Sequence, residues 1–262
     1  MKAVVFDVAG TLLERLRAVK NVHTGEVTDK ETTLDIIDEL PNTALVVLQT
    51  DTRTCIMKAN ENMTFYDFLV KHKIPIDISY SSSNIDKNEV VERLKEDKTL
   101  VKEFQEVAQI LAKKYNFIEI CSGSAFVFNV STNKIDYVIA AGGKIFPNVR
   151  KVIDTLSSEN IETYIASGDR EDSLYEIGDI IKIPDGNVFP TADMERKAEI
   201  VKEIKKTHKV MMVGNGPNDV LAFKNADVSV LTLEQKEPVT DSLMKSADYV
   251  INDIIEVLDI DF

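Results

Sequence analysis

Residues that could carry chemistry occur at four places at or beside the ends of predicted strands. They are Asp7 to Thr11, Ser167 to Asp169, Lys197, and Gly214 to Asp219. Their residue types suit phosphoryl transfer, which needs a nucleophile, a cation to hold the phosphoryl oxygens, and hydroxyl or cationic partners for the remaining charge. An aspartate can supply the nucleophile, because a carboxylate can form an aspartyl-phosphate. These residues therefore predict phosphoryl transfer, with Asp7 as the nucleophile.

The other polar residues can be assigned to the phosphate and to a metal ion. Lys197 can neutralise Asp7 and the phosphate together, and Ser167 can donate a hydrogen bond to a phosphoryl oxygen. Two carboxylates repel a phosphate dianion, so Mg²⁺ is expected, and it binds a few oxygen ligands while keeping several waters. Asp7, Asn215 and Asp219 are oxygen donors that can surround it. We place Thr11 and Gly168 with Ser167 and Lys197 at the phosphate.

The elements around these residues predict that they meet. Strands are predicted at 2–6, 161–166 and 209–213, of which 2–6 is a continuous apolar run, and they end just before Asp7, Ser167 and Gly214. Such runs are typical of buried parallel strands, and ligands of open parallel sheets bind beyond the carboxyl ends of the strands. After residue 147 the pattern alternates between helices and strands, which predicts an α/β fold with helices on both sheet faces. The expected segments are helices at 147–158, from about 170, at 193–206, 217–225 and 239–246, and strands at 227–231 and 248–251.

The middle of the chain follows a different pattern and predicts a separate domain. We expect a core of residues 1–20 plus 138–262 and an inserted α+β cap of residues 21–137, in which strand 44–49 stays out of the core sheet. The apolar stripe from Leu100 to Leu111 predicts an amphipathic helix. Further expectations are helices at 32–39, 64–72 and 86–96, a hairpin of 125–130 with 135–140, a turn at 23–26, and pairing of 53–58 with 44–49.

Composition narrows the function classes. The chain has 262 residues and a net charge of −13, so sequence-independent nucleic-acid binding and a polybasic membrane patch are unexpected. No apolar stretch reaches the roughly 20 residues that span a bilayer. Two cysteines do not form a disulfide framework, which favours a reducing cytoplasm. We expect a cytoplasmic monomer or small homo-oligomer whose partner is a small phosphorylated metabolite.

The order of these motifs resembles the haloacid dehalogenase superfamily. Residues 6–12 (FDVAGTL) resemble its first motif, in which a strand ends in Asp-x-Asp-Gly-Thr-Leu. Ser167 and Lys197 resemble the second and third motifs, and residues 214–219 (GNGPND) resemble the fourth, usually Gly-Asp-Gly-x-Asn-Asp. Within the superfamily the chain looks most like the phosphorylation domain of P-type ATPases, without their membrane helices. The resemblance implies a Rossmann-like core with a cap and a Mg²⁺-dependent phosphohydrolase that works through an aspartyl-phosphate.

Two positions depart from the family pattern. Ala9 replaces the second aspartate, which in family phosphatases protonates the leaving group and later activates water. Loss of such an acid/base typically costs roughly 10² to 10⁴ in rate. The metal ligand that the family takes from this position is a backbone carbonyl, which Ala9 retains. Asn215 replaces an aspartate, so Mg²⁺ binding should be weaker and Asp219 more important.

These departures leave two alternatives to a phosphatase. Phosphonate C–P hydrolases of the superfamily carry Ala at the position of Ala9 and use a Schiff-base lysine from the cap, but no cap lysine stands out. The second alternative is a binding or regulatory protein with degenerate chemistry, which Ala9 and Asn215 together favour.

Overall fold

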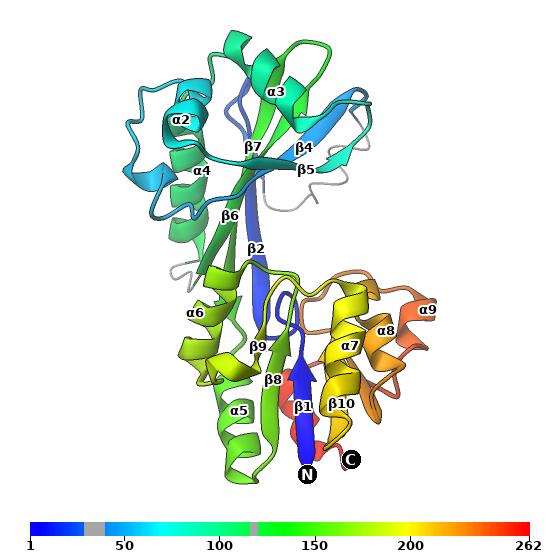
Figure 1. The fold of residues 1–262 in the computed structure, drawn as a ribbon. Coiled ribbons are helices and arrows are strands. Elements are labelled where there is room, and N and C mark those ends of the chain that lie inside the picture. Colours follow the sequence, from blue (N-terminus) through cyan, green and yellow to red (C-terminus); the bar gives the residue numbers. More distant parts are fainter. Residues whose placement is uncertain (29–39, 116–119) are drawn as a thin grey trace. The chain divides into compact units, whose positions relative to one another are not determined.

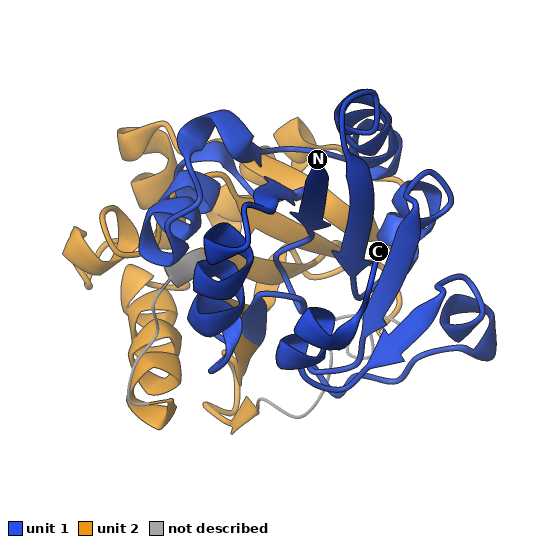
Figure 2. Ribbon diagram, turned by 90° about the horizontal axis from the view of Figure 1, so that it is seen from below, with its two compact units in different colours: residues 1–15, 144–262 blue, residues 16–143 orange. Residues whose placement is uncertain are grey.

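The computed structural model describes residues 1–28, 40–115 and 120–262, which divide into two compact units. Unit 1 contains residues 1–15 and 144–262, and unit 2 contains residues 16–143 (Figure 2). The predicted helix at 32–39 lies outside the described residues. None of the described helices is long and apolar enough to cross a membrane.

Unit 1 is built on a parallel six-stranded sheet, as predicted (Figure 1). Its strands, in spatial order, are β12 (Tyr249–Ile251), β11 (Val228–Thr232), β10 (Lys209–Gly214), β1 (Lys2–Phe6), β8 (Glu162–Ala166) and β9 (Val188–Phe189). The first strand in the sequence is therefore central in the sheet. Every side chain from Ala3 to Phe6 is 0% exposed. This burial on both faces explains why the strand reads as a continuous apolar run.

Helices cover the sheet of unit 1. They are α5 (Val149–Ser158), α6 (Glu171–Ile181), α7 (Met194–Ile204), α8 (Val220–Phe223) and α9 (Asp241–Met244), with 3-10 turns η3 (Asp185–Asn187), η4 (Pro217–Asp219) and η5 (Ile254–Asp259). One core cluster joins Ala3 and Val5 of β1 to Ile200 of α7 and Phe223 of α8. The α/β class and each helix expected after residue 147 are confirmed, although the helices predicted at 217–225 and 239–246 are shorter than expected.

The register of the central strands aligns their carboxyl ends. Phe6, the last residue of β1, pairs with Val213 of β10 on one side and Ile165 of β8 on the other. The residues that follow each strand therefore emerge at one edge of the sheet. This alignment brings the polar segments beginning at Asp7, Ser167 and Asn215 to the same place.

Unit 2 is an antiparallel sheet with helices. The strands, in spatial order, are β3 (Val27–Thr28), β2 (Leu13–Asn21), β7 (Lys134–Ile145), β6 (Ile120–Asn129), β4 (Thr43–Leu48) and β5 (Ile76–Ser81). The helices are α2 (Phe65–His72), α3 (Lys87–Arg93) and α4 (Val101–Lys114), with 3-10 turns η1 (Ile56–Lys58) and η2 (Leu94–Glu96). The β6–β7 hairpin and the β2–β3 turn are confirmed, and β4 pairs only within this sheet.

Aromatic packing holds the core of unit 2. The rings of Phe65 in α2 and Phe104 in α4 stack with centroids 4.0 Å apart, and Phe126 of β6 meets the Phe65 ring edge-on at 5.3 Å. All three side chains are buried. The predicted stripe is therefore part of this core through Phe104, Val107, Ala108 and Leu111, as expected for an amphipathic helix, whereas Leu100 lies at the helix N-cap and is half-buried.

One strand prediction in unit 2 is wrong. Residues 53–58 do not pair with β4, because Asp51 accepts a hydrogen bond from the Thr54 amide at 2.9 Å and turns the chain into η1. The partner of β4 on that side is β5. It is an edge strand in which Asp77 and Ser79 are exposed, and its apolar and polar residues alternate as in a half-buried strand.

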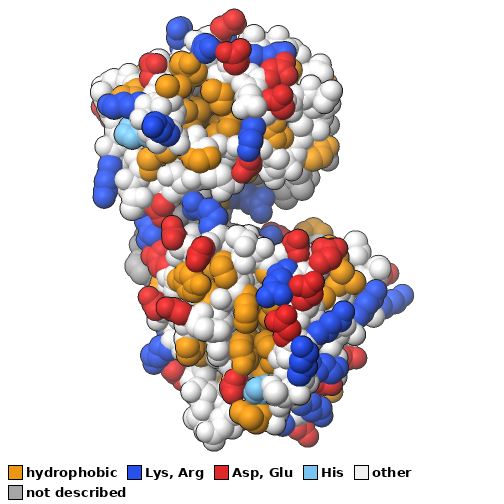
Figure 3. Space-filling view, viewed as in Figure 1, with side chains coloured by type: hydrophobic (Ala, Val, Ile, Leu, Met, Phe, Trp, Pro, Cys, Tyr) orange, Lys and Arg blue, Asp and Glu red, His pale blue; other side chains and the backbone are white. Residues whose placement is uncertain are grey.

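The unit boundaries also differ from the predicted ones. We predicted a core of 1–20 plus 138–262 and a cap of 21–137, whereas the units meet at residues 15/16 and 143/144. The chain enters unit 2 within β2 and returns within β7, so both boundaries fall inside long strands and not at turns. On the face shown in Figure 3, acidic and basic side chains are interspersed over each unit.

Candidate active site

The loop after β1 presents Asp7 at the carboxyl edge of the parallel sheet. The Asp7 side chain is 4% exposed, and its backbone amide donates to Val213 O at 2.9 Å. The loop turns back at once, since the Leu12 amide donates to Val8 O at 2.9 Å. Gly10 has φ +88°, and a Cβ there would lie 2.1 Å from Asn215 Nδ2. Only glycine permits this close approach between the first and fourth motifs.

Lys197 lies at the centre of a buried ionic triad. Its ammonium Nζ is 2.6 Å from Asp7 Oδ1 and 2.7 Å from Asp219 Oδ1, and its side chain is 0% exposed. Helix α7 positions it one turn after Asp193, the residue that caps the helix by accepting from the Arg196 amide. Lys197 therefore links two carboxylates that stand 212 residues apart in the sequence (219 − 7).

Hydrogen bonds to both oxygens hold the Asp219 carboxylate in place. While Oδ1 binds Lys197, Oδ2 accepts hydrogen bonds from the amides of Asn215 and Gly216, both at 3.0 Å. A Cβ at Gly214 would lie 2.5 Å from Asp219 Cγ, so the strand end leaves room for this carboxylate. Asp219 thus fixes the loop that carries Asn215 and orients Lys197.

The triad carries two carboxylates and one cation, and this shifts its proton affinities. Burial and the Asp219 carboxylate raise the pKa of Asp7 to about 7, and the Lys197 ammonium offsets part of the rise. Burial alone would lower the pKa of Lys197, but the two carboxylates raise it above its ordinary value. Lys197 therefore stays protonated, with its charge beside Asp7.

The second motif lies at the end of β8. Ser167 is 2% exposed, and its hydroxyl donates to Asp169 Oδ2 at 2.8 Å. Its backbone is held on both sides, because the Ser167 amide donates to Phe189 O and Ser167 O accepts from the Ala192 amide. This bonding fixes the loop through Gly168.

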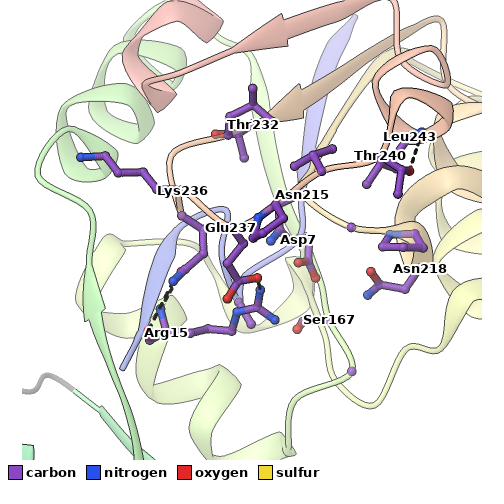
Figure 4. A pocket seen from close by; sticks show the side chains of 18 of the residues that line it. Asp7, Arg15, Ser167, Asn215, Asn218, Thr232, Lys236, Glu237, Thr240 and Leu243 are labelled. Carbon is purple, nitrogen blue, oxygen red and sulfur yellow. Dashed lines mark hydrogen bonds and ion pairs between the residues drawn. The ribbon is translucent and has the colours of Figure 1, made fainter. Parts of the chain in front are cut away.

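A cavity of about 410 Å³ opens above these loops (Figure 4). Of the predicted site residues, Asp7, Ala9, Ser167, Gly168 and Asn215 line it. Lys197 and Asp219 are buried behind it, in contact with Asp7 and with the Asn215 loop respectively. Thr11 does not line the cavity either: it is 0% exposed, and its Oγ1 has no hydrogen-bond partner in the described part of the chain.

No motif or periodicity predicted the rest of the cavity wall. Arg15 of β2 and the loop between β11 and α9 line it, and they are joined by an ion pair between Arg15 and Glu237 (Figure 4). Gln235 of this loop accepts from the Arg15 amide at 2.8 Å. These contacts join residues about 220 positions apart, which no local pattern encodes.

The cavity can hold a magnesium ion only if uncharged oxygen ligands, a backbone carbonyl and an amide side chain, join the one carboxylate of Asp7. Among the described residues, no three His, Cys, Asp or Glu side chains are grouped to hold a metal. Asp7, the Ala9 carbonyl and Asn215 line one cavity and are all oxygen donors, the class that Mg²⁺ prefers. Asp219 already uses both oxygens within the protein.

Comparison with known proteins identifies the family and several relatives of this chain. Residues 1–227 match the family model of the haloacid dehalogenase-like hydrolases. The chain is 32% identical, over 98% of its length and 92% of the relative's, to a soluble P-type ATPase-like phosphatase of Methanocaldococcus jannaschii. It is 28% identical to a probable copper-importing P-type ATPase A of Enterococcus hirae over 61% of the chain, which corresponds to 20% of that pump.

A solved structure of a phosphoserine phosphohydrolase-like protein from Francisella tularensis aligns with 99% of each chain at 12% identity and a TM-score of 0.45. The family match covers most of unit 1, including all four motifs that surround Asp7. With the motif order, the aligned strand ends and this match together, the chain belongs to the haloacid dehalogenase-like hydrolases, with a core similar to the phosphorylation domain of P-type ATPases.

Proposed function

We propose that the protein is a Mg²⁺-dependent phosphohydrolase that acts on a small phosphorylated metabolite through an aspartyl-phosphate at Asp7. The observation that carries the proposal is the buried contact of Asp7 with Lys197 at the wall of an open cavity that Ser167 and Asn215 also line. A carboxylate that accepts a hydrogen bond from a buried ammonium is oriented for nucleophilic attack.

In the proposed reaction, an Asp7 carboxylate oxygen attacks the phosphorus atom and the leaving group departs with the electron pair of its P–O bond. Ser167 and the Gly168 amide hold phosphoryl oxygens, and Lys197 stabilises the negative charge that gathers on them. Mg²⁺, held by Asp7, Ala9 and Asn215, would neutralise charge on the phosphate. Water then attacks the phosphorus atom and releases Asp7.

Trapping the covalent intermediate tests this proposal. The protein is mixed with radiolabelled acetyl phosphate and Mg²⁺, quenched in acid and digested. We expect label on the peptide that contains Asp7, removable by hydroxylamine as an acyl phosphate is, and absent after EDTA treatment. Absence of label under all conditions would instead favour the binding or regulatory role that Ala9 and Asn215 suggest.

Asn215→Asp should tighten Mg²⁺ binding. The substitution adds a negative charge at a side chain that lines the cavity with Asp7, and charge strengthens the binding of a hard cation. We expect Kd for Mg²⁺, measured by titration calorimetry, to fall by about tenfold. Asn218→Asp adds the same charge three residues away in the cavity wall and is the matched control. An equal gain in both variants would contradict a ligand role for Asn215.

Ala9→Asp should raise steady-state turnover of p-nitrophenyl phosphate by at least about tenfold, within the usual range for a positioned acid/base. Ala9 lines the cavity two residues after the nucleophile, so a carboxylate there can activate water. Wild-type protein should show an initial burst of p-nitrophenol as the intermediate accumulates, and the variant should not. Unchanged turnover and an unchanged burst would show that position 9 has no access to the attacking water.

A further inference from the structure

The loop between β11 and α9 brings a further carboxylate to the cavity. Glu237 lines it together with Asp7, and its side chain forms an ion pair with Arg15 (Figure 4). We propose that Glu237 is the general base that activates water against the aspartyl-phosphate, in the role left open by Ala9. This inference rests on the proposed function, since it concerns the second step of that reaction.

Contacts along β2 hold the Glu237 loop against the nucleophile loop. Gln235 Oε1 accepts from the Arg15 amide at 2.8 Å, and Gln235 Nε2 donates to Arg15 O at 3.3 Å. These two hydrogen bonds, and the ion pair of Glu237 with Arg15, hold the loop against β2, which begins six residues after Asp7. Glu237 is thereby anchored at the mouth of the same cavity from outside the four motifs.

The described cavity wall contains three carboxylates: Asp7, Asp169 and Glu237. Asp7 is the nucleophile. Asp169 Oδ2 accepts a hydrogen bond from the Ser167 hydroxyl at 2.8 Å, which assigns Asp169 to the orientation of the phosphate-binding serine. Glu237 is the anionic partner of a guanidinium, and a deprotonated carboxylate can accept a proton from water. In Figure 4 the Glu237 carboxylate and the Asp7 carboxylate turn toward the same space, beside the Arg15 guanidinium.

The step balances without a further reactant. The water oxygen attacks phosphorus, one water proton passes to the Glu237 carboxylate, and the bond between phosphorus and the Asp7 oxygen breaks. The electron pair of that bond returns to Asp7, and inorganic phosphate leaves. The Glu237 side chain is 41% exposed, so its proton can pass to solvent. The same exposure leaves it less fixed than an aspartate at position 9 would be, which agrees with the gain expected for Ala9→Asp.

The rate of phosphoenzyme decay tests the assignment. Protein is labelled with radiolabelled acetyl phosphate and Mg²⁺, chased with unlabelled donor, and quenched in acid at intervals. Acetate is a good leaving group, so formation needs no acid. For Glu237→Gln we expect label to form at the wild-type level and to decay at least about tenfold more slowly. The matched control is Glu234→Gln on the same loop: Glu234 accepts from the Ile254 amide and does not line the cavity, so decay should be unchanged.

The double variant Ala9→Asp with Glu237→Gln separates catalysis from loop structure. An aspartate at position 9 should take over the proton, so Glu237→Gln should slow decay by less than about twofold in that background. Equal slowing in both backgrounds, or no slowing in the wild-type background, would overturn the role of Glu237. Failure of every variant, and of wild type, to acquire label would overturn the proposed function instead, so the two failures are distinct.

Discussion

Asp7→Asn is expected to reduce hydrolysis of p-nitrophenyl phosphate by at least about 10³-fold, because the amide cannot act as the nucleophile. The same substitution is expected to make the fold more stable. Asn is nearly isosteric with Asp, and its amide oxygen can still accept a hydrogen bond from Lys197. The substitution removes one of the two negative charges of the buried triad. Loss of activity with a gain of stability is the pattern of a carboxylate held in place for chemistry.

The sign of the stability change follows from the pKa of Asp7. Burial raises this pKa from 3.8 to about 7, so the folded protein binds the Asp7 proton more tightly than the unfolded chain does. The resulting stability is present in full below a pH of about 4 and is lost as the pH rises to about 7. Asn does not ionise, so the variant escapes this loss. We expect its free energy of unfolding to exceed that of wild type by about 2 kcal/mol at pH 8, with a smaller excess at pH 5.

Urea unfolding at pH 5 and pH 8, in EDTA, measures this difference. Asp185→Asn makes the same chemical change at an exposed position in η3 and should leave both activity and stability unchanged. If Asp7→Asn is less stable than wild type at pH 8, the contact with Lys197 outweighs the repulsion between the carboxylates. If the variant keeps full activity, Asp7 is not the nucleophile.

Lys197→Met is expected to lower the free energy of unfolding by about 3 to 5 kcal/mol at pH 8, because removing one partner leaves a buried charge uncompensated. Here two carboxylates, Asp7 and Asp219, would face each other without the ammonium that now lies 2.6 and 2.7 Å from them. Their repulsion is relieved by protonation, so the loss of stability should be smaller at pH 5. Activity should fall by at least about 10²-fold, since the same ammonium stabilises the transferring phosphoryl group.

Lys202→Met is the matched control for this loss. It lies on the same helix α7, is exposed, and should change the free energy of unfolding by less than about 0.5 kcal/mol. Urea unfolding of both variants, with turnover measured on the folded fraction, gives the two effects separately. Wild-type stability in Lys197→Met would show that the triad contributes nothing to the fold.

Local sequence was sufficient for the core of unit 1. The apolar run at residues 2–6 predicts a buried parallel strand, and the structure places it at the centre of the sheet. The alternation of strands and helices after residue 147 predicts the α/β class. It can be read from the sequence because the spacing of apolar residues differs between a helix and a strand, according to which faces are buried. Ile76–Ser81 was not anticipated, although Ile76, Ile78 and Tyr80 alternate with polar residues as in a half-buried strand.

The sequence by itself determined that Asp7, Ser167 and Asn215 follow strand ends and must meet at one edge of a parallel sheet. Only the tertiary structure decided that Lys197 and Asp219 are buried behind the cavity. A lysine can be buried there because Asp7 and Asp219 both pair with its ammonium. It also decided that Arg15, Gln235 and Glu237 complete the cavity. These contacts depend on how the loop after β11 packs on β2, and no periodicity or motif in either segment records that packing.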